Sequence, residues 1–269
     1  MRFDLSSLIG LLVAGCAIVL GLKLEGGHMS SIAQPTAALV VLGGTLGAVV
    51  TQFPVMHLQR LLIDLRRIFH PAPSNESLLG TMMKLANKAR RDSIIALDRD
   101  LALLDDAFLR RGLELAVDGV DVRIIRETLE RELDRVDELN EQSAKVLESA
   151  GGYAPTVGIL GAVLGLIHVM ERLSEPAHLG AGIAVAFVST VYGVGFANLV
   201  LLPLAGRLKA RARQESLRLE LALEGVIAIA EKDSPRSLER RLSVYVDERR
   251  NGADRAHAKK AVERLRTAA

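Results

Sequence analysis

The sequence predicts an all-α, polytopic membrane protein with four transmembrane helices and a helical cytoplasmic domain. Charge-poor segments occur in two pairs, and a long, densely charged stretch separates the pairs. Hydrophobic residues make up 49% of the 269-residue chain and charged residues 25%, a pairing that is natural for a chain divided between lipid and water. No segment shows the alternation of apolar and polar residues that is typical of strands.

The four charge-poor segments define the predicted spans. A hydrocarbon core about 30 Å thick needs about 20 apolar residues per helix. The four segments meet this length, the first two at their widest bounds; they cover 5–24, 31–53, 150–170 and 179–204. The predicted domains are a transmembrane hairpin over 1–53, a cytoplasmic helical domain over 54–149, a second hairpin over 150–204, and cytoplasmic C-terminal helices with a basic tail over 205–269.

Basic residues give the expected orientation. They cluster after the second and fourth segments, at Arg60, Arg66, Arg67, Arg207, Lys209, Arg211 and Arg213. The two short connections, 23–33 and 171–178, hold few bases. Because cytoplasmic loops carry the excess of Lys and Arg, both termini are expected in the cytoplasm. The bases near 249–250 and 259–260 suit a tail that lies beside anionic membrane lipid.

The charged stretch over 54–149 is predicted to form successive helices. Ser74 and Asn75 offer an N-cap for the first helix, and Ser93 one for a second that carries its apolar residues as far as Leu115. Gly119 ends that helix, and Asp121 begins a third that runs into the third span.

The C-terminal region predicts two further helices. Residues 214–230 are amphipathic. Ser234 and Pro235 then provide an N-cap followed by proline at the first helical position, which opens a short helix through Val244.

Composition excludes several classes of function. A net charge of +2 gives no reason to expect a nucleic-acid partner, and the single cysteine, Cys16, excludes an internal disulfide. The sequence shows no nucleophile–base pair, phosphate loop or metal-ligand cluster, so neither an enzyme nor a bound cofactor is expected.

Two prolines and a few hydroxyls are the notable features of the last two spans. Pro155 and Pro203 lack the N–H that would bond the carbonyls of Gly151 and Leu199. We expect the prolines at similar depth, where they either form simple kinks or shape a hydrated vestibule. Ser189, Thr190 and Tyr192 add mid-span hydroxyls, while glycine and alanine at spacings of three or four residues predict close helix packing.

The spans contain no Asp, Glu, Lys or Arg near their centres. An ion-driven device needs an intramembrane carboxylate that binds and releases the ion. Any ion path through this chain must therefore borrow a carboxylate from another polypeptide.

Several motifs carry a resemblance to a known family. They are LKLEGGH at 22–28, ALVVLGGTL at 38–46, ARRDSIIALD at 89–98, YAPTVGILGAVLGLI at 153–167 and VSTVYGVGFANLVLLP at 188–203. Over nearly its whole length the chain resembles the MotA/PomA family of bacterial flagellar stator subunits, and is most similar to the MotC-type branch. The resemblance implies an inner-membrane ring of five copies around a MotB-like partner that supplies the missing aspartate, and torque delivered to the rotor protein FliG.

The resemblance also implies roles for individual residues. Arg90 and Asp98 match a basic and an acidic position eight residues apart that contact the rotor, with Arg91 as an alternative for the first. Pro155 and Pro203 match the structural prolines of the family. Thr190 matches one of two threonines of the sodium-driven members, but Ala162 stands where they carry the other. Since sodium needs several oxygen ligands, the loss of a hydroxyl favours protons, unless Thr156, Ser189 or backbone carbonyls complete a sodium site.

Two other functions stay open. A TolQ/ExbB-type energiser shares the small-residue, proline-bearing spans, but that family has three spans and lacks the 89–98 motif. A non-conducting membrane scaffold would use the prolines only to shape the bundle. Proton leak on co-expression with a MotB-like protein distinguishes the scaffold from a channel.

Overall fold

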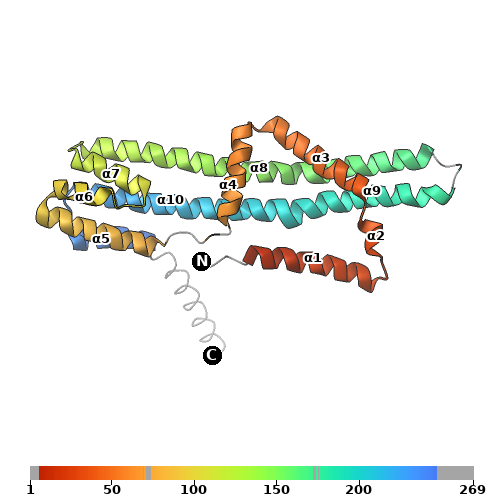
Figure 1. The fold of residues 1–269 in the computed structure, drawn as a ribbon, viewed down its shortest axis with the longest axis horizontal. Helices are drawn as coiled ribbons and strands as arrows, with labels where there is room; N and C mark the ends of the chain where they lie inside the picture. The colour runs from red at the N-terminus through yellow and green to blue at the C-terminus, as the bar shows by residue number, and fades with distance from the viewer. Residues whose placement is uncertain (1–5, 69, 71–73, 172–173, 175, 247–269) are drawn as a thin grey trace, which may run out of the picture. The chain divides into compact units, whose positions relative to one another are not determined.

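The computed structural model describes residues 6–68, 70, 74–171, 174 and 176–246, and over these residues the chain is helical and has no strand. Figure 1 follows the helices from the red N-terminal end to the blue C-terminal part. The elements are α1 (Ser6–Leu24), α2 (Met29–Ile32), α3 (Pro35–Gln52), α4 (Val55–Ile68), α5 (Asn75–Asp92), a 3₁₀ turn (Ile94–Leu97), α6 (Asp98–Leu101), α7 (Ala107–Val117), α8 (Val122–Glu171), α9 (Pro176–Phe196), a π-helical turn (Ala197–Leu201), α10 (Leu202–Ala230) and α11 (Pro235–Val246).

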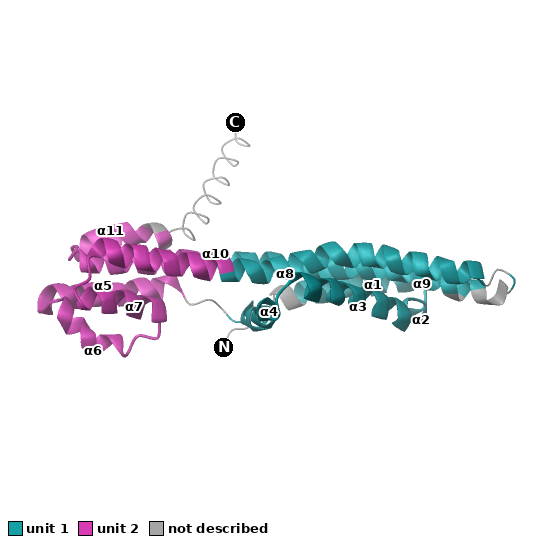
Figure 2. Cartoon of the chain, turned by 90° about the horizontal axis from the view of Figure 1, so that it is seen from above, with its two compact units in different colours: residues 1–71, 139–212 teal, residues 72–138, 213–269 magenta. Residues whose placement is uncertain are grey.

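The chain forms two compact units. Unit 1 comprises residues 1–71 and 139–212, and unit 2 comprises 72–138 and 213–269 (Figure 2). Two of the three boundaries fall inside α8 and α10, so each of these long helices contributes one part to each unit.

Unit 1 contains the apolar helices. Among the described residues, three helical stretches are long and apolar enough to cross a membrane: Met29–Gln52, Val122–Glu171 and Gly182–Ala230. A fourth apolar stretch, Ile9–Leu24 in α1, is shorter. The expected all-helical membrane fold is confirmed, while the fourth crossing, by α1, stays a prediction.

Within unit 1, α3 contacts α9, and every fourth residue along one face of α3 is buried: Ala37, Val41, Thr45 and Val49. Helix α4 is held by a buried polar contact as well as by apolar ones. The Ser143 hydroxyl in α8 donates a 2.7 Å hydrogen bond to the Asp64 carboxylate, and Arg60 Nε lies 3.4 Å from the same carboxylate. Because the buried charge is paired, this contact fixes α4 on α8 without leaving an unsatisfied carboxylate.

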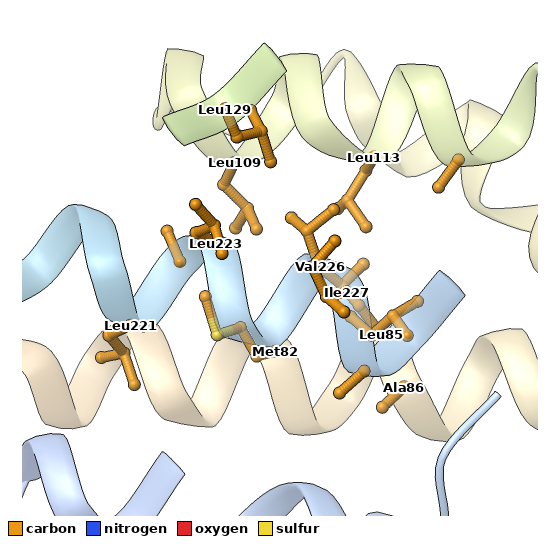
Figure 3. Packing of buried hydrophobic residues seen from close by; sticks show 14 of the residues in the cluster. Met82, Leu85, Ala86, Leu109, Leu113, Leu129, Leu221, Leu223, Val226 and Ile227 are labelled. Carbon is orange, nitrogen blue, oxygen red and sulfur yellow. The ribbon is translucent and has the colours of Figure 1, made fainter. Parts of the chain in front are cut away.

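Unit 2 has a core of large aliphatic side chains contributed by α5, α7, α8, α10 and α11. Figure 3 shows this packing between side chains of α5, α7, α8 and α10. The labelled residues are Met82, Leu85, Ala86, Leu109, Leu113, Leu129, Leu221, Leu223, Val226 and Ile227. Two glycines allow the helices to approach closely. A Cβ at Gly112 would lie 2.9 Å from Leu129 Cδ1, and one at Gly225 would lie 2.3 Å from Met82 Sδ.

The helix predicted between Ser93 and Gly119 is wrong as a single element. Ser93 has φ +88°, which ends α5, and a 3₁₀ turn, α6 and α7 follow in place of one helix. The Asp106 carboxylate caps α7 by accepting a 3.0 Å hydrogen bond from the Leu109 N–H. The helical spacing of the apolar residues extends across these breaks, because each short piece turns the same side toward the core.

The other predicted helix starts are confirmed. Ser74 Oγ accepts from the Ser77 N–H at 3.2 Å at the start of α5, and Ser234 Oγ accepts from the Ser237 N–H at 3.2 Å at the start of α11. Gly119 has φ +75° between α7 and α8, and Asp121 precedes α8 as expected. Helix α11 ends at Val246, two residues beyond the prediction, and the bases at 249–250 and 259–260 lie outside the described residues.

Candidate ion pathway and rotor-contact surface

Helices α8 and α9 meet along a seam of small residues. A Cβ at Gly193 would lie 2.4 Å from the Ala154 carbonyl oxygen, and one at Gly158 would lie 2.9 Å from the Ser189 carbonyl oxygen. Further along the seam, a Cβ at Gly165 would lie 2.9 Å from the Ala186 backbone nitrogen. The two helices are therefore in backbone contact, which is the close packing that small residues permit in membranes.

The seam fixes how the two helices are aligned. Pro155 directly follows Ala154, which contacts Gly193, whereas Pro203 directly follows Leu202, whose side chain lies against Gly151. The two prolines are therefore offset by roughly two helical turns, or about 11 Å along the helices. The expectation that they lie at one depth is wrong, because their positions depend on the alignment of the seam and not on their distances from the predicted span ends.

The two prolines also differ in their local backbone. Helix α8 continues as an α-helix through Pro155. Before Pro203 the chain forms a π-helical turn over Ala197–Leu201. The missing N–H of Pro203 removes the ordinary partner of the Leu199 carbonyl, which suits a local change of hydrogen-bond spacing. Single π-turns within α-helices occur often at functional sites.

Ala162 and Thr190 lie at the same level of the hairpin, as expected. A Cβ at the adjacent Gly161 would lie 2.9 Å from Ser189 Oγ. Both Ala162 and Thr190 are half-buried. Thr190 Oγ1 is 3.5 Å from the Ala186 carbonyl oxygen, so the side-chain hydroxyl of Thr190 is only weakly engaged by its own helix.

The other predicted hydroxyls have different surroundings. Ser189 is fully buried in the seam, and its hydroxyl donates to the Val185 carbonyl at 2.8 Å. Thr156 is exposed and donates to the Tyr153 carbonyl at 2.8 Å. The structure therefore brings Thr190, Ala162 and Ser189 to one level, but places Ser189 inside the seam.

Tyr192 connects α9 to the start of α3. Its hydroxyl donates to the Ile32 carbonyl at 2.5 Å and accepts from the Gln34 N–H at 3.4 Å. These two backbone groups lie at the break between α2 and α3 and also hydrogen-bond to each other at 3.0 Å, so the Tyr192 hydroxyl ties α9 to this break. Thr45, in contrast, is a buried residue of α3 whose hydroxyl has no hydrogen-bond partner among the described residues.

One face of α9, of the π-helical turn and of the start of α10 is exposed between Ile183 and Leu202. The exposed residues are Ile183, Phe187, Val191, Val194, Asn198 and Leu202. Asn198, in the π-helical turn, is the one polar member of this stripe, and its amide donates to the Val194 carbonyl at 3.0 Å. Asn198 has no formal charge and was not predicted as a site residue; an amide within an apolar span is the signal that would have identified it.

The three predicted rotor-contact residues all lie on the exposed surface of unit 2. Arg90 and Arg91 lie in the last turn of α5, and Asp98 begins α6. Arg91 forms a two-pronged contact with Asp92, with Nε and Nη2 each 2.8 Å from a carboxylate oxygen. This hydrogen bonding, strengthened by the opposite charges, raises the pKa of Arg91 and lowers the pKa of Asp92. Within the described residues, Arg90 and Asp98 form no ion pair.

Two family profiles together match most of the chain. Residues 8–93 match the Motility protein A N-terminal family, and residues 101–221 match the MotA/TolQ/ExbB proton channel family.

Individual relatives extend the similarity over nearly the full length. Motility protein A of Bacillus subtilis (strain 168) is 34% identical over 90% of this chain and 91% of its own length. Chemotaxis protein PomA of Vibrio alginolyticus is 30% identical over 91% of this chain and 96% of its own.

Solved structures agree with this. A chain of C. jejuni MotAB superposes with a TM-score of 0.86 at 27% identity, covering 91% of this chain and 96% of that one. A chain of the flagellar MotAB stator complex from Bacillus subtilis gives 0.83 at 33% identity, covering 91% and 97%. The chain therefore belongs to the MotA/PomA family of flagellar stator subunits, which are channel subunits and not enzymes.

Proposed function

We propose that this chain is the proton-conducting stator subunit of a bacterial flagellar motor and that it turns ion flow into torque together with a MotB-like partner. The observation that carries the proposal is the exposed face between Ile183 and Leu202, which among the described residues is apolar apart from Asn198 and contains no acid. A carboxylate that carries the ion must then come from a second polypeptide packed on this face. The solved relatives, which are MotAB complexes, support this partner.

The proposed assembly is a ring of five copies around the MotB-like subunits, in the bacterial inner membrane, with both termini in the cytoplasm. The seam supports this assembly, because the backbones of α8 and α9 are in contact and hold the hairpin together. The hairpin can then present its exposed faces to a partner and to neighbouring copies without changing its own packing. We also propose that the chain belongs to the MotC-type branch, which it resembles most.

Co-expression with a MotB-like partner tests the proposal. In a motile host without its own stators, the pair should restore swimming and each subunit alone should not. A pair lacking the partner's membrane aspartate serves as the control and should assemble without restoring motility. Assembly without proton conduction would support a scaffold, and proton conduction without motility would support a TolQ/ExbB-type energiser.

Proton selectivity follows from the level shared by Ala162 and Thr190. With one side-chain hydroxyl at that level, a dehydrated sodium ion would lack oxygen ligands, whereas a proton needs the partner's carboxylate and a chain of water. Thr190→Ala should therefore be tolerated better than Pro155→Ala, which restores an N–H and alters the backbone beside the seam. Swimming speed, measured at equal membrane levels of the two variants, provides the comparison.

Contact with the rotor protein FliG is proposed through Arg90 and Asp98, both exposed and without an ion pair among the described residues. An exposed ion pair contributes about 0–1 kcal/mol, so single neutralisations should weaken motility without abolishing it. Reversing both charges, Arg90→Glu with Asp98→Lys, should strongly impair swimming while the membrane complex still assembles. Arg135→Glu, an exposed arginine of the same unit outside the 89–98 segment, is the control. Unchanged swimming in the double reversal would exclude these two contacts.

A further inference from the structure

Unit 2 exposes few large apolar side chains. Among its described residues they are Ile95, Leu103 and Ile124, which are 68%, 80% and 55% exposed. Single exposed aliphatic residues are ordinary on protein surfaces, so exposure alone indicates no function. The position of Ile95 sets it apart from the other two, because it lies within the segment that bears Arg90 and Asp98.

The backbone around Ile95 is held in a specific form. Ser93 has φ +88°, a region that a residue with a side chain seldom adopts and that persists where the surrounding structure holds it. The 3₁₀ turn that follows is anchored by Leu97, which is fully buried, and by Ile94, which packs against the core. Because the turn is anchored on both sides of Ile95, the backbone that carries this exposed side chain is held in place.

The charges around this turn fall into two groups. Arg91 pairs with Asp92 at 2.8 Å, and Lys88 pairs with Asp100 at 2.7 Å. Arg90, five residues before Ile95, and Asp98, three residues after it, form no ion pair within the described residues. In the sequence, the exposed Ile95 therefore lies between a cation and an anion that form no ion pair within the described residues. Protein interfaces commonly combine an apolar centre with a polar rim.

We propose that Ile95 is the apolar anchor of the rotor contact and enters an apolar recess of the rotor protein that is flanked by charges complementary to Arg90 and Asp98. This inference rests on the proposed function. Exposed charge pairs contribute little affinity and are screened by salt, so they orient the contact more than they hold it. Removing the Ile95 side chain from water supplies attraction that salt does not screen.

Stall torque in a host without its own stators provides the first test, with the full chain and its MotB-like partner present. Ile95→Asp should abolish torque and Ile95→Ala should lower it, while Ile95→Met should retain it because the apolar contact is kept. Membrane level and co-purification with the partner should be unchanged in all three variants. Ile124→Ala, a similarly exposed isoleucine in α8, is the matched control and should leave torque unchanged.

Binding of the purified complex to purified FliG at low and high salt separates the apolar contact from the electrostatic one. Ile95→Ala should weaken binding about tenfold at both salt concentrations. The Arg90→Glu, Asp98→Lys variant should lose most of its deficit at high salt, where its charges are screened. A loss for Ile95→Ala that disappears at high salt would overturn the anchor.

The outcomes also separate this inference from the proposed function. If the double charge reversal lowers torque while Ile95→Asp does not, the anchor is wrong and the rotor contact stands. Equal losses in Ile95→Ala and Ile124→Ala would likewise overturn the anchor. If neither the charge reversal nor Ile95→Asp changes torque, the rotor contact itself is wrong and the anchor is rejected with it.

Discussion

The seam of unit 1 and the core of unit 2 both depend on glycines, but what each glycine meets is different. At the seam, a Cβ at Gly193 or Gly158 would meet backbone oxygens of the facing helix. In the core, a Cβ at Gly225 would meet the flexible side chain of Met82. A side chain can change rotamer to make room, but a packed backbone cannot move without separating the helices. The seam should therefore tolerate substitution far less than the core does.

The difference follows from the surroundings of each unit. Unit 1 leaves large apolar residues exposed, among them Leu39, Val163 and Phe187. Between apolar helices in lipid there is no hydrophobic driving force, so close packing of small residues has to hold them together. Unit 2 buries large aliphatic side chains in its core, where removal of apolar surface from water supplies the stability.

The largest expected effect is at the seam. Gly193→Ala places a Cβ 2.4 Å from the Ala154 carbonyl oxygen, so α8 and α9 must separate or shift. We expect loss of the assembled complex and no detectable swimming. Gly195→Ala, where a Cβ has nothing within 4 Å, is the matched control and should swim normally. Normal assembly of the Gly193→Ala variant, measured by co-purification with the partner, would contradict the rigid seam.

A smaller effect is expected in the core. Gly225→Ala places a Cβ 2.3 Å from Met82 Sδ, and repacking of Met82 should limit the cost to about 1–3 kcal/mol. Gly80→Ala, at an open position of α5, should instead stabilise the unit by up to about 1 kcal/mol through better helix propensity. Urea unfolding of the detergent-solubilised complex measures both. If Gly225→Ala prevented assembly as completely as Gly193→Ala, the two regions would not differ as described.

The smallest effect concerns charges that hold α11 in unit 2. Burial disfavours the Glu224 carboxylate, but hydrogen bonds from Arg126 at 2.8 Å and from Arg241 at 2.8 Å outweigh it and keep the pKa of Glu224 below its usual range. A lowered pKa means that this stabilisation is complete above the ordinary carboxyl pKa and is lost as the pH falls through the lowered value.

Glu224→Gln should therefore cost about 1–2 kcal/mol at neutral pH and less in acid. Thermal unfolding of the purified complex from neutral to acidic pH gives the comparison with the unchanged chain. A deficit that stays constant across this range would show that Glu224 acts through shape and not through its charge.

Much of the helical fold follows from local signals in the sequence. Ser74 and Ser234 cap helices at the predicted positions, because a cap depends on residues within one turn. The helix boundary at Ser93 was predicted, but the division of the following helix into a 3₁₀ turn, α6 and α7 was not, because its apolar residues keep a helical spacing across the breaks.

The candidate site likewise has some features that the sequence predicts and others that it does not. Arg90, Asp98 and Thr190 could be identified from motifs, and the shared level of Ala162 and Thr190 from counting residues. The offset of Pro155 and Pro203 could not, because the alignment of two helices is set by contacts between residues distant in the chain. Asn198 is visible in the sequence, but its exposure depends on which face of α9 the other helices cover.

The central claim, proton coupling, is tested most directly by identifying the ion gradient that drives swimming. The complex with its MotB-like partner should be expressed in a host that lacks its own stators, and swimming speed should be measured while either the proton gradient or external sodium is removed. We predict that a protonophore stops swimming and that replacing sodium by potassium leaves the speed unchanged. Speed that rises and falls with external sodium would contradict proton coupling and indicate that Thr190 is joined by further oxygen ligands from Thr156, Ser189 or the backbone.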